Sequence, residues 1–195
     1  MPFGDRLVST KKAGHNMTPH DLVARGLSPE IAVFITSMLP IIELRGALPM
    51  AINFFHIAWP KAFLISFIGN LIPVPFILWL LAPVVKVLSK IKPIGNFFEW
   101  LFKRTRRKGN TVIEKYEEIG LLAFVAIPLP GTGAWTGALI AFLFGLEFKK
   151  SFLVIMLGVF IAGVIVTCLC LLGWLGALIA GIGVIFLAIL GFWKL

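Results

Sequence analysis

Three long stretches of the sequence contain no Asp, Glu, Lys or Arg, and they constrain the fold more than any other feature. They cover residues 62–85, 119–146 and 151–193, and a further apolar stretch, 31–58, carries only two such residues. The hydrocarbon core of a bilayer is about 30 Å thick, so a spanning helix needs roughly 20 apolar residues. Each stretch is long enough to span, and the last is long enough to span twice. We therefore expect an all-α integral membrane protein.

Positive charge is concentrated in one connector. Nine of the 18 Lys and Arg residues lie between Lys86 and Lys115, although the whole chain has a formal net charge of +9. Loops rich in Lys and Arg stay on the cytoplasmic side of a membrane and can lie on anionic headgroups. We therefore expect 86–118 to be a basic, amphipathic, cytoplasmic connector of a multi-pass inner-membrane protein. This distribution favours membrane topology over nucleic-acid binding as the origin of the charge.

Two of the apolar stretches, 31–58 and 119–146, are interrupted near their midpoints by proline and glycine. A continuous helix of this length would measure about 42 Å, too long for the core without strong tilt. Proline removes a backbone donor and disfavours helix for its predecessor, whereas glycine lets the chain turn. We therefore expect two re-entrant hairpins. The residues expected to form them are Pro40, Gly46, Pro49, Pro128, Pro130, Gly131, Gly133 and Gly137.

The two halves of the chain resemble each other. Lys61 precedes Gly69 by eight residues, as Lys150 precedes Gly158, and similar residues follow both lysines. A unit with one hairpin and one spanning helix has an odd number of crossings, so the second unit would be inverted, as in many transporters. The expected parts are a polar segment 1–30 with a short amphipathic helix, repeat 31–85 (hairpin 31–58, helix 62–85), repeat 119–173 (hairpin 119–146, helix 151–173) and a C-terminal transmembrane helix 176–193.

Full crossings by kinked helices are the alternative for 31–58 and 119–146. The number of basic residues on the cytoplasmic side differs by one between the two topologies, so the positive-inside rule leaves both open.

Glu43 and Arg45 are the only Asp, Glu, Lys or Arg residues in the first apolar stretch. Charge at membrane depth is costly and usually marks a functional site. The planar fork of Arg45 suits an anionic group such as phosphate or carboxylate, and Glu43 would then carry a proton. The alternative is that the two residues form a pair that only holds the hairpin together.

We call the interruptions of 31–58 and 119–146 the first and the second break. The second break has no charge but contains Thr132, Trp135 and Thr136, which we expect to line a substrate site. A half-helix that begins there would present free N–H groups to an anion. Close helix packing is the alternative use of the small residues. A site between the two breaks requires these side chains to lie near Glu43 and Arg45. Asn70 is a further candidate for lining the site, with a helix-to-helix hydrogen bond as its alternative.

The sequence predicts no metal site, no cofactor and no enzymatic activity. Cys168 and Cys170 lie two residues apart in an apolar stretch, on different sides of a helix, and no P-loop, dinucleotide fingerprint or catalytic triad is present. The expected partners are membrane lipids and a small-molecule or lipid-phosphate substrate, without nucleic acid. A homo-oligomer is left open.

The motifs Glu43-Leu-Arg-Gly-Ala-Leu-Pro49 and Pro128-Leu-Pro-Gly-Thr-Gly-Ala-Trp-Thr-Gly-Ala138 resemble the small multidrug export protein family of bacteria and archaea. This resemblance implies a transporter-like membrane protein of the small multidrug export type. Together with Glu43, Arg45 and the two breaks, it leads us to expect a proton-coupled transporter with an anionic or amphiphilic substrate held between the hairpins. A non-transporting membrane scaffold is a further alternative.

The family is in turn similar to the DedA proteins, which have paired re-entrant hairpins in an inverted repeat and are implicated in proton-linked movement of polyprenyl phosphate or other lipids. That similarity implies a lipid flippase or scramblase as an alternative function. Acidic and arginine residues of DedA hairpins are functional, and only Glu43 and Arg45 match them here. The uncharged second break departs from the DedA pattern.

Overall fold

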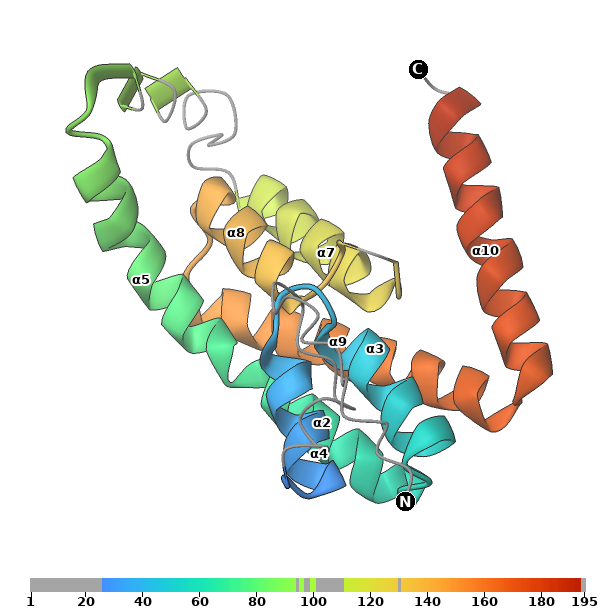
Figure 1. Cartoon of the computed structure of the whole chain (residues 1–195). Helices are drawn as coiled ribbons and strands as arrows, with labels where there is room; N and C mark the ends of the chain where they lie inside the picture. Colours follow the sequence, from blue (N-terminus) through green and yellow to red (C-terminus); the bar gives the residue numbers. More distant parts are fainter. Residues whose placement is uncertain (1–25, 94, 97–98, 101–110, 130, 194–195) are drawn as a thin grey trace, which may run out of the picture.

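The computed structural model describes residues 26–93, 95–96, 99–100, 111–129 and 131–193, and within these it is helical without strands. Figure 1 shows the helices crossing one another at the centre of the molecule, with α10 (Trp174–Trp193) at one side. The all-α prediction is therefore confirmed. The short helix expected before residue 30, Pro130 and much of the connector 86–118 lie outside the described residues.

The first interrupted stretch forms three short helices: α2 (Pro29–Met38), α3 (Glu43–Pro49) and the π-helical turn η1 (Met50–Phe54). Leu39 is extended, as expected for a residue before proline, so α2 ends ahead of Pro40. Pro49 has no N–H to donate, and the helix that follows it widens from α to π geometry.

The second interrupted stretch forms α7 (Thr111–Ala126) and α8 (Ala134–Phe144). Gly131, with φ +82°, lies in the left-handed region, which lets the chain turn between them. Gly145, with φ +77°, ends α8 in the same conformation. The expected interruptions of both stretches are therefore present.

Two helical stretches are long and apolar enough to cross a membrane: Trp59–Leu88, which comprises α4 (Trp59–Leu71) and α5 (Pro73–Leu88), and α9 (Phe148–Leu171). At 1.5 Å per residue both exceed the thickness of a bilayer core. They agree with the expected helices 62–85 and 151–173 to within three residues at each end, and α10 agrees similarly with 176–193. Whether the short helix pairs re-enter or cross the bilayer remains a prediction.

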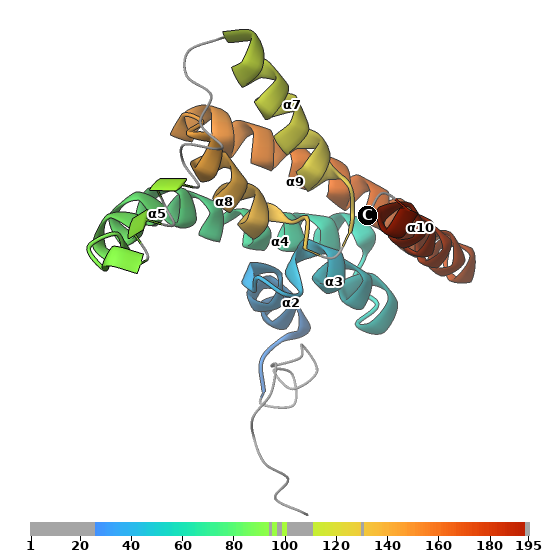
Figure 2. The ribbon, with the colours of Figure 1, turned by 90° about the horizontal axis from the view of Figure 1, so that it is seen from above.

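Helices at matching places in the two halves make matching contacts. In the first half α2 packs on α4 and α3 packs on both α4 and α9, whereas in the second half α7 packs on α9 and α8 packs on both α9 and α5. Figure 2, seen from above, shows α10 away from α2 and α8, and its contacts are made mainly with α9. Each half thus places a short helix against the long helix of the other half.

The repeated lysines and glycines also have matching surroundings. Lys61 pairs with Glu30 of α2 at 3.0 Å, and Lys150 lies 3.8 Å from Glu118 of α7. A Cβ on Gly69 would collide with α2, and a Cβ on Gly158 would lie 2.8 Å from Val125 of α7. These correspondences follow the spacing that suggested the repeat.

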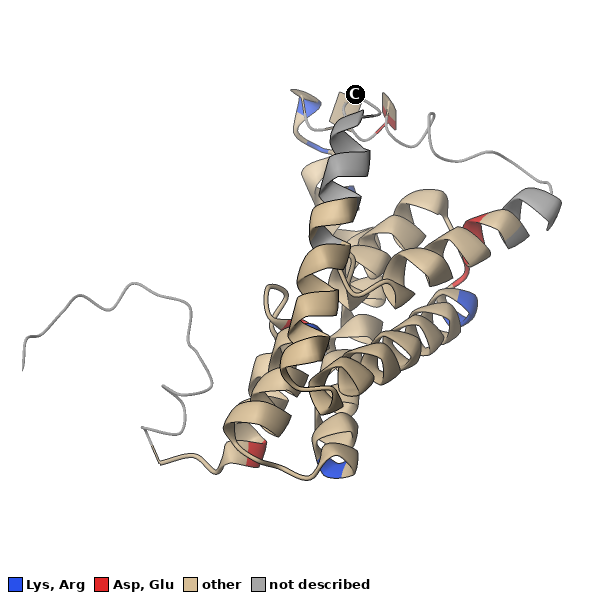
Figure 3. Ribbon diagram, turned by 90° about the vertical axis from the view of Figure 1, so that its right-hand side faces the viewer, with Lys and Arg blue, Asp and Glu red and all other residues tan. Residues whose placement is uncertain are grey.

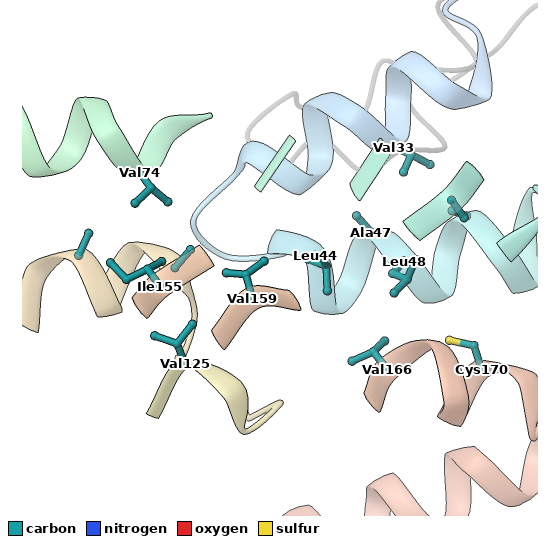
Figure 4. Packing of buried hydrophobic residues seen from close by; sticks show 14 of the residues in the cluster. Val33, Leu44, Ala47, Leu48, Val74, Val125, Ile155, Val159, Val166 and Cys170 are labelled. Atoms are coloured by element: carbon teal, nitrogen blue, oxygen red, sulfur yellow. The ribbon is translucent and has the colours of Figure 1, made fainter. Parts of the chain in front are cut away.

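The core lies where α3, α4, α7, α8 and α9 meet, and Figure 4 shows its aliphatic side chains, among them Leu44, Leu48, Val125 and Ile155. Large apolar residues also cover much of the outer surface; Trp79 is 73% exposed and Ile182 is 65% exposed. In Figure 3 charged residues lie at the margins of the molecule, apart from one red and blue pair in the middle. This distribution is typical of a protein surrounded by lipid.

We predict that Gly69→Ala and Gly158→Ala each destabilise the protein by about 1–3 kcal/mol, because the new methyl group overlaps a packed neighbour. Gly120→Ala is the matched control, since a Cβ on this glycine of α7 meets nothing within 4 Å. Thermal unfolding of the purified variants measures the difference. Equal melting temperatures for all three variants would contradict the helix packing described above.

Candidate functional site

Glu43 lies at the start of α3 with its backbone in the left-handed region, at φ +49°, and the residue is only 5% exposed. This conformation is uncommon for a residue other than glycine and costs of order 1 kcal/mol. One carboxylate oxygen, Oε2, accepts a hydrogen bond from Arg45 at 2.8 Å. The other, Oε1, accepts one from the backbone N–H of Trp135 at 3.3 Å. The carboxylate of Glu43 therefore points towards the second break.

The Glu43 carboxylate occupies the N-terminus of α8, where unpaired N–H groups and the helix dipole favour an anion. The anion site expected in the second break is thus filled by the protein itself. Gly133, the residue before α8, leaves the space for it: a Cβ at this position would overlap the carboxylate.

The guanidinium of Arg45 lies at the C-terminal end of α7, the helix on the other side of the same break. One terminal nitrogen donates to the backbone oxygens of Val125 at 2.8 Å, Thr132 at 3.0 Å and Ile127 at 3.3 Å. The last carbonyls of an α-helix lack partners within the helix, and a cation is favourable beside them. Nε of Arg45 is buried and has no partner among the described residues.

The structure brings Thr132 and Trp135 to the charged pair, as a site between the two breaks requires. Trp135 also donates from its indole nitrogen to the backbone oxygen of Met38 at 3.1 Å, which ties α8 to the end of α2. The hydroxyls of Thr132 and Thr136 donate to backbone oxygens of Ile127 and Gly131, both at 2.7 Å. The two hydroxyl groups thus stabilise the conformation of their own break.

Asn70 is not part of this network. It is buried in α4, and its Oδ1 has no hydrogen-bond partner in the described part of the chain. Of the other expected hairpin residues, Gly46 and Gly137 lie within α3 and α8, where they allow close contact with Ile42 and Val125. The described residues contain no group of three His, Cys, Asp or Glu side chains that could hold a metal ion.

A cavity of about 460 Å³ lies on the other side of Arg45, between α3–η1, the second break, α9 and α10. Arg45 and Asn53 are the polar side chains among its described lining residues. Glu43, Thr132, Trp135, Thr136 and Asn70 do not border it. The lining residues are Arg45, Pro49, Asn53, Ile127, Pro128, Leu129, Ile165, Val166, Leu169, Cys170, Gly173, Gly176, Ala177, Ile179, Ala180 and Gly183.

The part of the cavity wall that α9 and α10 contribute was not predicted from the sequence. A signal was present, because Gly176, Ala180 and Gly183 recur at helical spacing and place small residues on one face. Asn53 was also missed, since its side chain faces the cavity from a π-helical turn that the sequence pattern does not reveal.

Residues 43–165 match the family model described as "Putative small multi-drug export protein". The chain belongs to this family. The match begins at Glu43 and ends within α9, so it contains both motifs and confirms the resemblance seen in them. Together with the two long apolar stretches, it identifies a membrane protein.

No curated protein and no solved structure matches the chain. The resemblance to DedA proteins therefore stays a prediction.

We predict that Gly133→Ala destabilises the protein by about 1–3 kcal/mol, because the methyl group displaces the Glu43 carboxylate. In that background Glu43→Asp, whose side chain is shorter, should recover part of the lost stability, although it is destabilising on its own. Thermal unfolding of the two single variants and the double variant measures this coupling. Independent, additive effects would show that the carboxylate does not occupy this position.

Proposed function

We propose that the protein is a proton-coupled membrane transporter of the small multi-drug export type, with anionic amphiphiles as its substrates. The observation that carries the proposal is the position of Arg45. Arg45 borders an apolar cavity, and its charge is balanced by Glu43, the one carboxylate that pairs with it among the described residues.

Proton coupling rests on competition for Arg45. The nitrogen that holds Glu43 at 2.8 Å is the group that would bind an anionic substrate. A buried pair that loses one charge leaves the other uncompensated, which is costly. Protonation of Glu43 would therefore leave Arg45 in need of an anion, and the substrate would supply it. The proton and the anionic group of the substrate would therefore bind together.

The groups around Glu43 agree with this role. Arg45 faces it from α3 and the N–H of Trp135 faces it from α8, so the described groups that touch the carboxylate are all donors. Protonation would weaken both contacts and loosen the link between the two breaks. The site would thus change its contacts and its charge in the same step.

The membrane arrangement that we propose has two re-entrant hairpins in an inverted repeat, followed by a C-terminal transmembrane helix, with the connector 86–118 in the cytoplasm. Lys61 and Lys150 make matching contacts, each with a glutamate, and Gly69 and Gly158 each pack closely on a neighbouring helix. These correspondences support the repeat. Irregular backbone at membrane depth must be covered by protein or a cavity, and the contacts of Arg45 cover the second break.

A non-transporting scaffold is the second candidate, because the same contacts of Glu43 and Arg45 would be needed merely to hold the two breaks together. A DedA-like lipid flippase is a variant of the first candidate, since a lipid phosphate is also an anionic amphiphile. The two candidates differ in what happens when the pair changes its charge but the fold persists.

We expect the protein in phosphatidylcholine vesicles to accelerate uptake of taurodeoxycholate, an anionic amphiphile, when the external solution is more acidic than the lumen, because proton and anion bind together. Glu43→Gln and Arg45→Lys should abolish this acceleration: the first removes the exchangeable charge and the second removes the bidentate fork. The measurement is the rate of taurodeoxycholate uptake, with the amount and melting temperature of each variant determined in parallel.

Glu30→Gln is the matched control. Glu30 is a half-buried carboxylate just before the first apolar stretch, and the hydrogen bond from Lys61 lowers its pKa, so it too carries a charge in the folded protein. This variant should keep the proton-driven uptake of the wild type. Wild-type uptake by folded Glu43→Gln would exclude proton coupling through Glu43, and no uptake by the wild-type protein would favour the scaffold.

A further inference from the structure

We infer that the cavity beside Arg45 binds the apolar tail of the substrate and that α10 sets the size of tail it accepts. This inference rests on the proposed function for the polar end of the ligand. It assigns a role in substrate selection to a helix that lies wholly beyond the residues matched by the family model.

The chemistry of the cavity defines the ligand. Its volume of about 460 Å³ falls within the roughly 300–1,000 Å³ of small-molecule sites. Aliphatic side chains of α9, including Ile165, Val166 and Leu169, form one wall. Apolar walls with so few polar groups cannot replace the water of a polar ligand, so they favour hydrocarbon.

The polar groups lie on one side of the cavity. Arg45 and Asn53 both belong to the α3–η1 segment, across the cavity from α10. Nε of Arg45 is buried and lacks a partner among the described residues. The π-helical turn that carries Asn53 is a feature often found at functional sites. An amphiphile would therefore place its head beside these groups and its tail towards α9 and α10.

The space for a tail exists because most of the α10 residues at the cavity are small. Gly176, Ala177, Ala180 and Gly183 border it together with one large residue, Ile179, whereas Leu178 and Ile182 of the same helix are exposed and do not line it. A Cβ on Gly176 would overlap the backbone oxygen of Leu169, so the helices touch here, but a Cβ on Gly183 meets nothing within 4 Å. Larger side chains at Gly183 would fill the cavity without disturbing a neighbour.

Two cysteines of α9 report occupancy of the cavity. Cys170 is buried and lines it, whereas Cys168 is exposed and does not. With the protein in nanodiscs of phosphatidylcholine, tetradecyl sulfonate should slow alkylation of Cys170 by N-ethylmaleimide and leave the rate at Cys168 unchanged. Mass spectrometry of the two sites gives both rates in one sample.

Two glycine variants provide a matched comparison. Gly183→Leu adds a side chain to the cavity side of α10 and takes up space that the tail would occupy. We expect it to weaken protection of Cys170 by tetradecyl sulfonate roughly tenfold, which corresponds to a loss of about 1.4 kcal/mol in binding free energy. Gly181→Leu adds the same side chain to a glycine that does not line the cavity and whose Cβ would also meet nothing within 4 Å. It should behave as wild type.

Three results would overturn the inference: no protection of Cys170 by the sulfonate, equal protection in both glycine variants, or full shielding of Cys170 by phosphatidylcholine alone. The proposed function fails by a different result, namely unchanged proton-driven uptake of taurodeoxycholate in Glu43→Gln. If Cys170 is not protected while Glu43→Gln still abolishes this uptake, the tail site is wrong and the proposed function stands.

Discussion

The ion pair between Glu43 and Arg45 is the interaction on which the centre of this protein depends. Its two side chains come from the first helix break, yet they complete the second: the carboxylate lies at the N-terminus of α8, and the guanidinium holds backbone oxygens at the end of α7. Helix ends at membrane depth carry polar groups that lipid cannot satisfy. One pair of charges meets that need on both sides of the break, and each charge lowers the cost of burying the other.

The same contacts suit the pair to the transport role that we propose. The pair borders a cavity through Arg45 and contains a group, Glu43, that can take up a proton. Loss of the carboxylate charge would release the α8 N-terminus and the guanidinium together. The contacts that hold the two breaks together are therefore the same contacts that uptake of a proton would release.

Much of the fold and part of the site follow from the sequence. Long runs without charge predict α4–α5, α9 and α10, and proline and glycine predict the breaks. The cost of charge in lipid identifies Glu43 and Arg45, and pairing of the breaks places them near Thr132 and Trp135. The sequence could not reveal that the Glu43 carboxylate itself occupies the expected anion site, because this depends on the left-handed backbone at Glu43 and the space at Gly133. The cavity was missed because it arises from the angle between α9 and α10, which local patterns do not determine.

Competition between Glu43 and the substrate for Arg45 is the central claim, and the pH dependence of anion binding tests it most directly. The measurement is the affinity of the protein in nanodiscs for tetradecyl sulfonate, whose headgroup stays ionised, at a series of pH values. The wild type should bind more tightly as the pH falls and Glu43 takes up a proton. Glu43→Gln should bind at least as tightly as the protonated wild type at every pH. The same pH dependence in both proteins would contradict the account.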